Sequence, residues 1–114
     1  MSTLSTHVLD TSLGLPAQDL ALTLEQQNPD GNWRELARAR TNTDGRVPAL
    51  LPPGTAMAQG IYRLTFDTAG YFRARKSPGF YPYVQVVFEL TSSTDHCHVP
   101  LLLSPFGYST YRGS

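Results

Sequence analysis

The eight residues 20–27, LALTLEQQ, decide the fold class. Leu20, Leu22 and Leu24 occupy every second position, with smaller or polar residues between them. Side chains of a β-strand point alternately to its two faces, so this spacing predicts a strand with one buried face. Residues 28–31, NPDG, follow directly. Proline presets one backbone angle and glycine accepts a positive φ, so the strand should end in a tight turn.

The same alternation recurs along the rest of the chain between Gly, Pro, Asn and Asp turns. It is present in LSTHVLD (4–10), GIYRLTFDT (60–68), YPYVQVVFEL (81–90), DHCHVPLLLS (95–104) and FGYSTYR (106–112). NWRELARART (32–41) is compatible with a strand or a helical turn, and AGYFRARKS (69–77) is the one short segment with helical character. Seven or eight short strands separated by turns predict an all-β antiparallel sandwich.

Composition narrows the classes of function. The 114 residues fit one domain, 1–114. Nine Lys and Arg balance nine Asp and Glu. This balance argues against a nucleic-acid binder or a polybasic membrane surface. It also means that little charge repulsion opposes association between copies of the chain. No apolar run approaches the ~20 residues of a membrane span, and the first ten residues lack the basic start and apolar core of a signal peptide. The single cysteine, Cys97, fits a reducing compartment, so we expect a soluble cytoplasmic domain.

Three histidines are the main candidates for chemistry: His7, His96 and His98. His96 and His98 are two residues apart on a predicted strand and should share one face, while Cys97 should point to the other. The pair is compatible with an exposed polar edge, with a metal site completed by His7, or with acid–base catalysis near neutral pH. The metal site is the weaker hypothesis, because thiolates and clustered acids are missing from this face.

Four ordered segments resemble the 5-hydroxyisourate hydrolases, the transthyretin-like proteins of purine breakdown. They are LSTHVLDTSLGLPA (4–17), TNTDGR (41–46), GFYPYVQVVFEL (79–90) and HVPLLLSPFGYSTYRGS (98–114). The closing Tyr-Arg-Gly-Ser is the signature that separates these hydrolases from transthyretin itself. The resemblance spans essentially the whole chain.

The resemblance implies a transthyretin-type sandwich of two four-stranded antiparallel sheets with one short helix. It also implies a homotetramer with active sites at subunit interfaces, no cofactor, no metal, no nucleic acid and no membrane. The implied reaction is hydrolysis of 5-hydroxyisourate to 2-oxo-4-hydroxy-4-carboxy-5-ureidoimidazoline in urate breakdown. The alternative is a non-enzymatic, transthyretin-like carrier of a ligand.

Site residues follow from the same resemblance, position by position. The catalytic group is His7, Arg46, His98 and Ser114. The substrate-binding group is His7, Arg46, Tyr111, Arg112 and Gly113. A water between the two histidines would lose a proton to one of them as it attacks the ring carbonyl, and which histidine acts as base is left open. Relatives often carry Tyr where this chain has Cys97, a difference expected to affect packing rather than chemistry.

Overall fold

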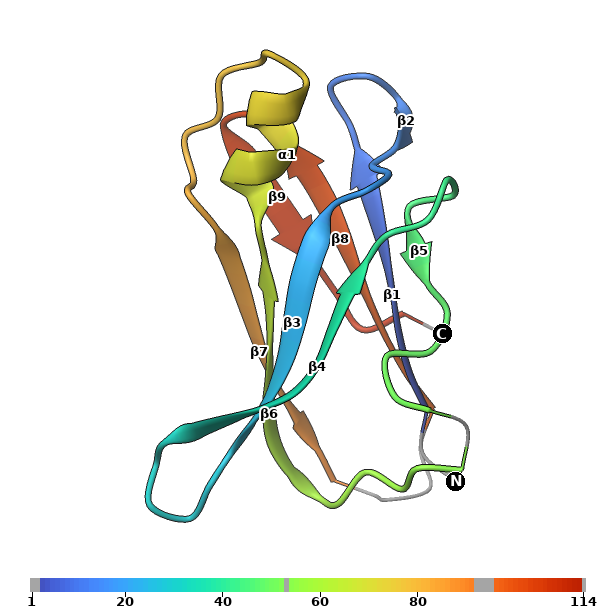
Figure 1. The fold of residues 1–114 in the computed structure, drawn as a ribbon, viewed down its shortest axis with the longest axis vertical. Coiled ribbons are helices and arrows are strands. Elements are labelled where there is room, and N and C mark those ends of the chain that lie inside the picture. Colours follow the sequence, from blue (N-terminus) through green and yellow to red (C-terminus); the bar gives the residue numbers. More distant parts are fainter. Residues whose placement is uncertain (1–2, 53, 92–95, 114) are drawn as a thin grey trace.

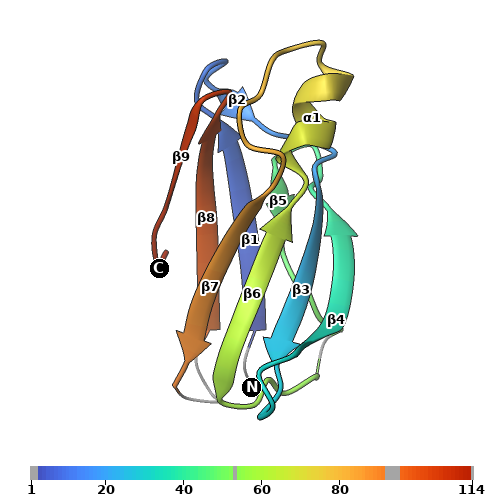
Figure 2. The same cartoon turned by 90° about the vertical axis from the view of Figure 1, so that its left-hand side faces the viewer.

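A computed structural model describes residues 3–52, 54–91 and 96–113, and within these ranges it forms two facing sheets and one helix (Figures 1 and 2). The first sheet is made of β1 (Thr3–Asp10), β2 (Leu15–Pro16), β5 (Arg46–Val47), β8 (His96–Ser104) and β9 (Gly107–Thr110). The second sheet is made of β3 (Ala21–Gln27), β4 (Trp33–Arg40), β6 (Gly60–Phe66) and β7 (Val84–Leu90). The predicted helix is α1 (Thr68–Ala74). No helix among the described residues has the length and apolar character needed to cross a membrane.

The strand order confirms the sandwich and differs from the expected sheets in two details. The first sheet runs β2-β1-β8-β9, with β5 also paired to β1, so it has five strands rather than four. Its central pair, β1 and β8, is parallel, whereas every other pairing among the described strands is antiparallel. Antiparallel pairing follows from a short hairpin connection. β1 and β8 are instead separated by the whole of the second sheet, so no hairpin sets their direction.

The core lies between the sheets and follows the predicted alternation. Leu22 and Leu24 of β3 are buried, as are Leu64 and Phe66 of β6. The ambiguous segment around Trp33 is a strand, because it pairs with β3 along most of its length. Burial of alternate apolar side chains on two facing sheets is the main source of stability in such a sandwich.

The helix α1 ties the second sheet to the end of β1. The side chain of Asp67 accepts a hydrogen bond from Gly70 N at 3.0 Å and so caps the helix. Tyr71 is buried, and its hydroxyl donates to Oδ2 of Asp10 at 2.8 Å. The other carboxylate oxygen of Asp10 accepts from the turn that follows β1, including the backbone N–H of Ser12 at 3.0 Å. One buried carboxylate therefore joins the helix, the strand and the turn.

The same contacts set the pKa values of the buried pair. Burial of Asp10 raises the pKa of its carboxyl, but hydrogen bonds from Ser12, Tyr71 and Leu13 together outweigh burial and hold the pKa below its usual value of 3.8. Burial and the hydrogen bond to Asp10 raise the pKa of Tyr71 to about 12. At neutral pH the pair therefore consists of a carboxylate and a protonated phenol.

We predict that Tyr71→Phe lowers the free energy of unfolding by about 1.5–3 kcal/mol at neutral pH, the usual cost of losing a hydrogen bond to a charged group. Because the folded-state pKa of Asp10 is depressed, its stabilising effect is complete above pH 3.8 and disappears as the pH falls through the folded-state value. The difference between variant and parent should therefore shrink in acid. Urea unfolding at neutral and acid pH measures it, with the exposed Tyr83→Phe as a control.

Candidate active site

Three chain segments bring His7, Arg46 and His98 to the outer face of the first sheet. In the β1–β5 pairing His7 lies opposite Arg46, and in the β1–β8 pairing His98 lies opposite Ser5. Ser5 and His7 are two residues apart on β1, so their side chains point to the same face. β5, β1 and β8 are neighbours in Figure 1. The structure therefore brings together three of the four residues that the resemblance assigned to catalysis.

The turn before β5 places Arg46 beside His7. Oδ1 of Asn42 accepts hydrogen bonds from the backbone N–H groups of Asp44 and Arg46 at 2.9 and 3.0 Å. Gly45 has φ of +73°, and its carbonyl accepts from Val8 N at 2.7 Å. A Cβ at Gly45 would collide with the carbonyl oxygen of Val8. Glycine is thus needed both for the turn conformation and for the close approach to β1.

His7 is half-buried beside this turn. Burial is the largest influence on its imidazole, and the charge of Arg46 adds to it, so the pKa of His7 lies below its usual value of 6.5. A hydrogen bond to the backbone of Asp44 and the charge of that residue act in the opposite direction. His7 is therefore neutral at neutral pH and has a carboxylate nearby.

Burial and neighbouring groups act mostly in one direction on His98. Burial lowers the pKa of His98 most, followed by the charges of Arg46, His7 and His96. A hydrogen bond between the ring and the backbone of Ser5 opposes these effects. Nδ1 of His98 also lies 2.8 Å from the hydroxyl oxygen of Ser5. A neutral imidazole with one hydrogen-bonded nitrogen leaves the other nitrogen available as a proton acceptor.

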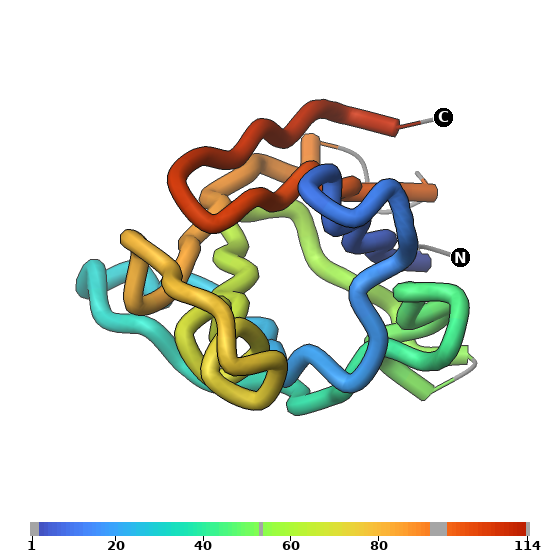
Figure 3. The backbone as a smooth tube through the Cα atoms, turned by 90° about the horizontal axis from the view of Figure 1, so that it is seen from above, coloured from blue at the N-terminus to red at the C-terminus, as the bar shows by residue number. Residues whose placement is uncertain are grey.

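The C-terminal segment lies against β8 beside His98. The backbone N–H of Gly113 donates to the carbonyl of His98 at 2.8 Å, and the two residues form an antiparallel bridge. Upstream, the hydroxyl of Thr110 donates to the carbonyl of Pro100 at 2.7 Å. Figure 3 shows this segment running along the outside of the molecule beside β8. Ser114, predicted to lie close to the histidines, is outside the described residues.

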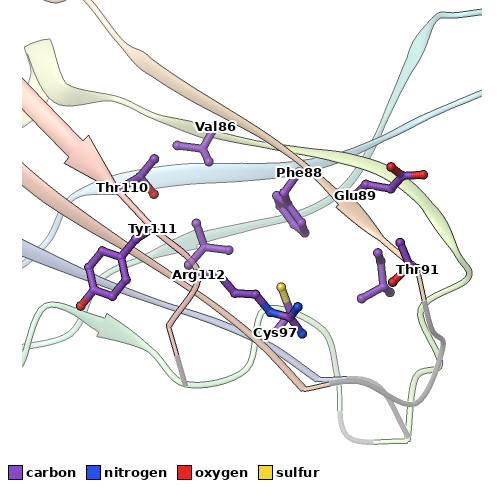
Figure 4. A pocket seen from close by; sticks show the side chains of 10 residues that line it. Val86, Phe88, Glu89, Thr91, Cys97, Thr110, Tyr111 and Arg112 are labelled. Carbon is purple, nitrogen blue, oxygen red and sulfur yellow. The ribbon is translucent and has the colours of Figure 1, made fainter.

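Tyr111 and Arg112 line a separate cavity of about 150 Å³ between β7 and the β8–β9 edge. Figure 4 shows the side chain of Arg112 extending toward Cys97 in this cavity, with Phe88 beside it. Cys97 is buried, which confirms that it points away from the face of His98. The predicted contacts of Tyr111 and Arg112 with substrate stay predictions.

The other two hypotheses for the pair of His96 and His98 were an exposed polar edge and a metal site. His96 is exposed, and its Nδ1 hydrogen-bonds to the hydroxyl of Thr3. In the ranges 3–52, 54–91 and 96–113, no three His, Cys, Asp or Glu side chains form a group that could hold a metal ion.

One contributor to this site had no clear signal in the sequence, and a second was predicted with another role. Ser5 precedes His7 by two residues, which places it on the same face, but its contact with His98 depends on the β1–β8 register. Gly113 was predicted to bind substrate, whereas the structure places it directly against the imidazole of His98.

The chain resembles known proteins in both sequence and fold. A model of the HIUase/transthyretin family matches residues 4–113. A 5-hydroxyisourate hydrolase from Mus musculus is 54% identical over 114 residues, covering 99% of this chain and 96% of the relative. The structure of Klebsiella pneumoniae 5-hydroxyisourate hydrolase superposes with a TM-score of 0.86 at 35% identity, covering 98% and 99% of the two chains. Sea bream transthyretin in complex with thyroxine superposes with a TM-score of 0.91 at 33% identity, covering 97% and 94%.

We predict that Arg46→Gln raises the pKa of both His7 and His98, because the charge of Arg46 lowers the pKa of each imidazole. NMR titration of the two histidines measures the change. Arg38→Gln, on β4 of the other sheet, is the matched control and should leave both pKa values where they are. Unchanged histidine titrations in Arg46→Gln would contradict the arrangement described here.

Proposed function

Since the chain belongs to the HIUase/transthyretin family, we propose that it hydrolyses 5-hydroxyisourate in urate breakdown. The product is 2-oxo-4-hydroxy-4-carboxy-5-ureidoimidazoline. The observation that carries the proposal is the presence of His7, Arg46 and His98 on one face of the first sheet. A hydrolase structure and a transthyretin structure both share the fold of this chain, so the fold alone does not distinguish an enzyme from a carrier. The 54% identity to the mouse hydrolase supports the enzyme.

The two histidines are suited to complementary roles in opening the ring. Burial and the charge of Arg46 favour the neutral form of His98, so we assign it the role of the base. His7 is also neutral at the start, so it can receive the proton of the attacking water from His98 and pass it to the leaving nitrogen, and the charge of Asp44 favours the protonated form in which it does so. Water attacks the ring carbonyl as His98 takes its proton, the C–N bond breaks, and His7 protonates the leaving nitrogen. The net change is the addition of one water.

Arg46 supplies the positive charge for this reaction. An arginine guanidinium is positively charged and presents rigidly arranged hydrogen-bond donors. We assign it the orientation of the anionic substrate and the stabilisation of the developing oxyanion. Tyr111 and Ser114 are assigned to closing the pocket. Arg112, exposed beside the cavity that it lines, and Gly113, which lies against His98, would act on the substrate through the position of the C-terminal segment.

A homotetramer with active sites at subunit interfaces is part of the proposal. The β1–β2 connection and the β8–β9 turn lie at the same end of the first sheet (Figure 2). At this end Thr11 N, directly after β1, donates to the carbonyl of Leu103 near the end of β8 at 2.8 Å. This end carries large apolar side chains that are exposed in one subunit: Leu13, Leu15, Phe80 and Phe106. Such a group of exposed apolar side chains is typical of a contact surface. A cytoplasmic location is also proposed, and the single cysteine of the chain supports it.

We predict that His98→Asn abolishes hydrolysis while the protein keeps its oligomeric state, because a well-placed base contributes about 10²–10⁴-fold to the rate. The assay follows the loss of 5-hydroxyisourate absorbance after urate oxidase has generated the compound. His96→Asn, on the same strand and face, is the control and should retain activity. A parent protein that binds this compound without hydrolysing it would favour the carrier instead.

We predict that Phe106→Glu dissociates the oligomer, because it places a charge at an exposed apolar side chain of the proposed contact surface. Sedimentation velocity measures the assembly. Val87→Glu makes the same change at an exposed valine of the second sheet and should not alter the oligomeric state. Equal sedimentation of both variants and the parent would exclude this surface.

A further inference from the structure

We infer that Ser5 is a positioning residue that fixes the ring orientation and the tautomer of His98, while Gly113 closes the other side of the same ring. Nε2 of His98 is then the atom that takes the proton from water. The expected effect on catalysis rests on the proposed hydrolysis, whereas the tautomer of the His98 ring can be measured without any substrate.

Ser5, His98 and Gly113 form one row across the first sheet. Ser5 is the partner of His98 in the parallel β1–β8 pairing. Gly113 is the partner of His98 on the other side, in the bridge that continues the register of β8 and β9. Adjacent residues in a row have their side chains on the same face of a sheet. The imidazole therefore stands between a serine and a residue that has no side chain.

The Nδ1 edge of the imidazole faces Ser5. The hydroxyl oxygen of Ser5 is 2.8 Å from Nδ1, and Ser5 is only 9% exposed. In the arrangement that we infer, the hydroxyl oxygen of Ser5 accepts from Nδ1, which therefore carries the proton. In a neutral imidazole the second nitrogen, Nε2, then has a free lone pair.

The Cδ2 edge of the imidazole faces Gly113. A Cβ at Gly113 would lie 2.5 Å from Cδ2 of His98 and 3.2 Å from Cγ of Pro100. No positive φ is involved at this glycine, so the requirement is for space alone. Rotating the ring by half a turn would exchange Nδ1 and Cδ2 and break the contact with Ser5. The two neighbours together therefore hold one orientation.

A similar pair on the same two strands provides an internal comparison. Thr3 lies opposite His96 in the β1–β8 register, and its hydroxyl contacts Nδ1 of His96. This pair is exposed, whereas Ser5 is buried beside His98. Removing the hydroxyl of Thr3 thus repeats the chemical change made at Ser5, but beside a histidine to which no catalytic role is assigned.

The first test replaces Ser5 and reads the ring of His98 directly. ¹⁵N NMR of the parent protein should show the neutral ring protonated at Nδ1. Ser5→Ala should shift it toward a mixture with the Nε2-protonated form and lower kcat on the order of tenfold, part of the effect of acid–base catalysis, with KM little changed. Ser5→Thr, which keeps the hydroxyl, should restore both readouts, and Thr3→Ala should leave both as in the parent.

The second test fills the space at Gly113. Gly113→Ala should displace the imidazole of His98, visible as changed ring shifts, and lower kcat by at least the tenfold expected for the loss of a correctly placed base. Gly107→Ala is the matched control on β9, because its Cβ would meet only Ser104 Oγ at an ordinary 3.7 Å. Urea unfolding of each variant separates a displaced ring from a destabilised fold.

Two results would overturn the inference: a parent ring protonated at Nε2, or a Ser5→Ala protein with the parent's tautomer and kcat. The proposed function fails differently, through a parent protein that does not hydrolyse 5-hydroxyisourate. The tautomer measurement still decides the inference about Ser5 in that case.

Discussion

The parallel pairing of β1 with β8 is the constraint on which the rest of the structure depends. It joins two segments from opposite ends of the chain along eight residue pairs, from Thr3 with His96 to Asp10 with Leu103. On the inner side this pairing buries apolar residues of both strands, and the buried hydroxyl of Thr6 donates to the carbonyl of Val99 at 2.6 Å. On the outer side it sets the neighbours of each histidine. The inner face of this strand pair therefore contributes to stability, and its outer face carries the histidines.

Two imidazoles on the outer face of the first sheet are kept neutral although they share this face with the guanidinium of Arg46. Burial and the charge of Arg46 act in the same direction on His7 and His98, so neither ring is lost as a base at neutral pH. The backbone contacts of the rings, to Asp44 and to Ser5, act in the opposite direction. These contacts come from different segments, the turn before β5 and the strand β1, so each histidine has its own partner although the two share a charged neighbour.

Much of this arrangement could be predicted from the sequence, because it depends on local patterns. The alternation in residues 20–27 and 60–68 placed their buried faces correctly, and Asn42 with Gly45 marked the turn before Arg46. The parallel direction of β1 and β8 could not be predicted in this way, since no local pattern encodes the direction of strands so distant in the chain. The contact between Ser5 and His98 depends on that register and was missed for the same reason.

The alternation of faces along β1 and β8 also shapes how such a protein can evolve. Inserting or deleting one residue in either strand would exchange the inner and outer sets, bringing Cys97 to the position of His98 and apolar side chains to solvent. Length changes there would be eliminated by selection, whereas substitutions at outer positions leave the core untouched. A lineage could therefore gain or lose hydrolysis by a few exchanges on one face. Hydrolases and a thyroxine-binding transthyretin with closely superposable folds are consistent with such a history.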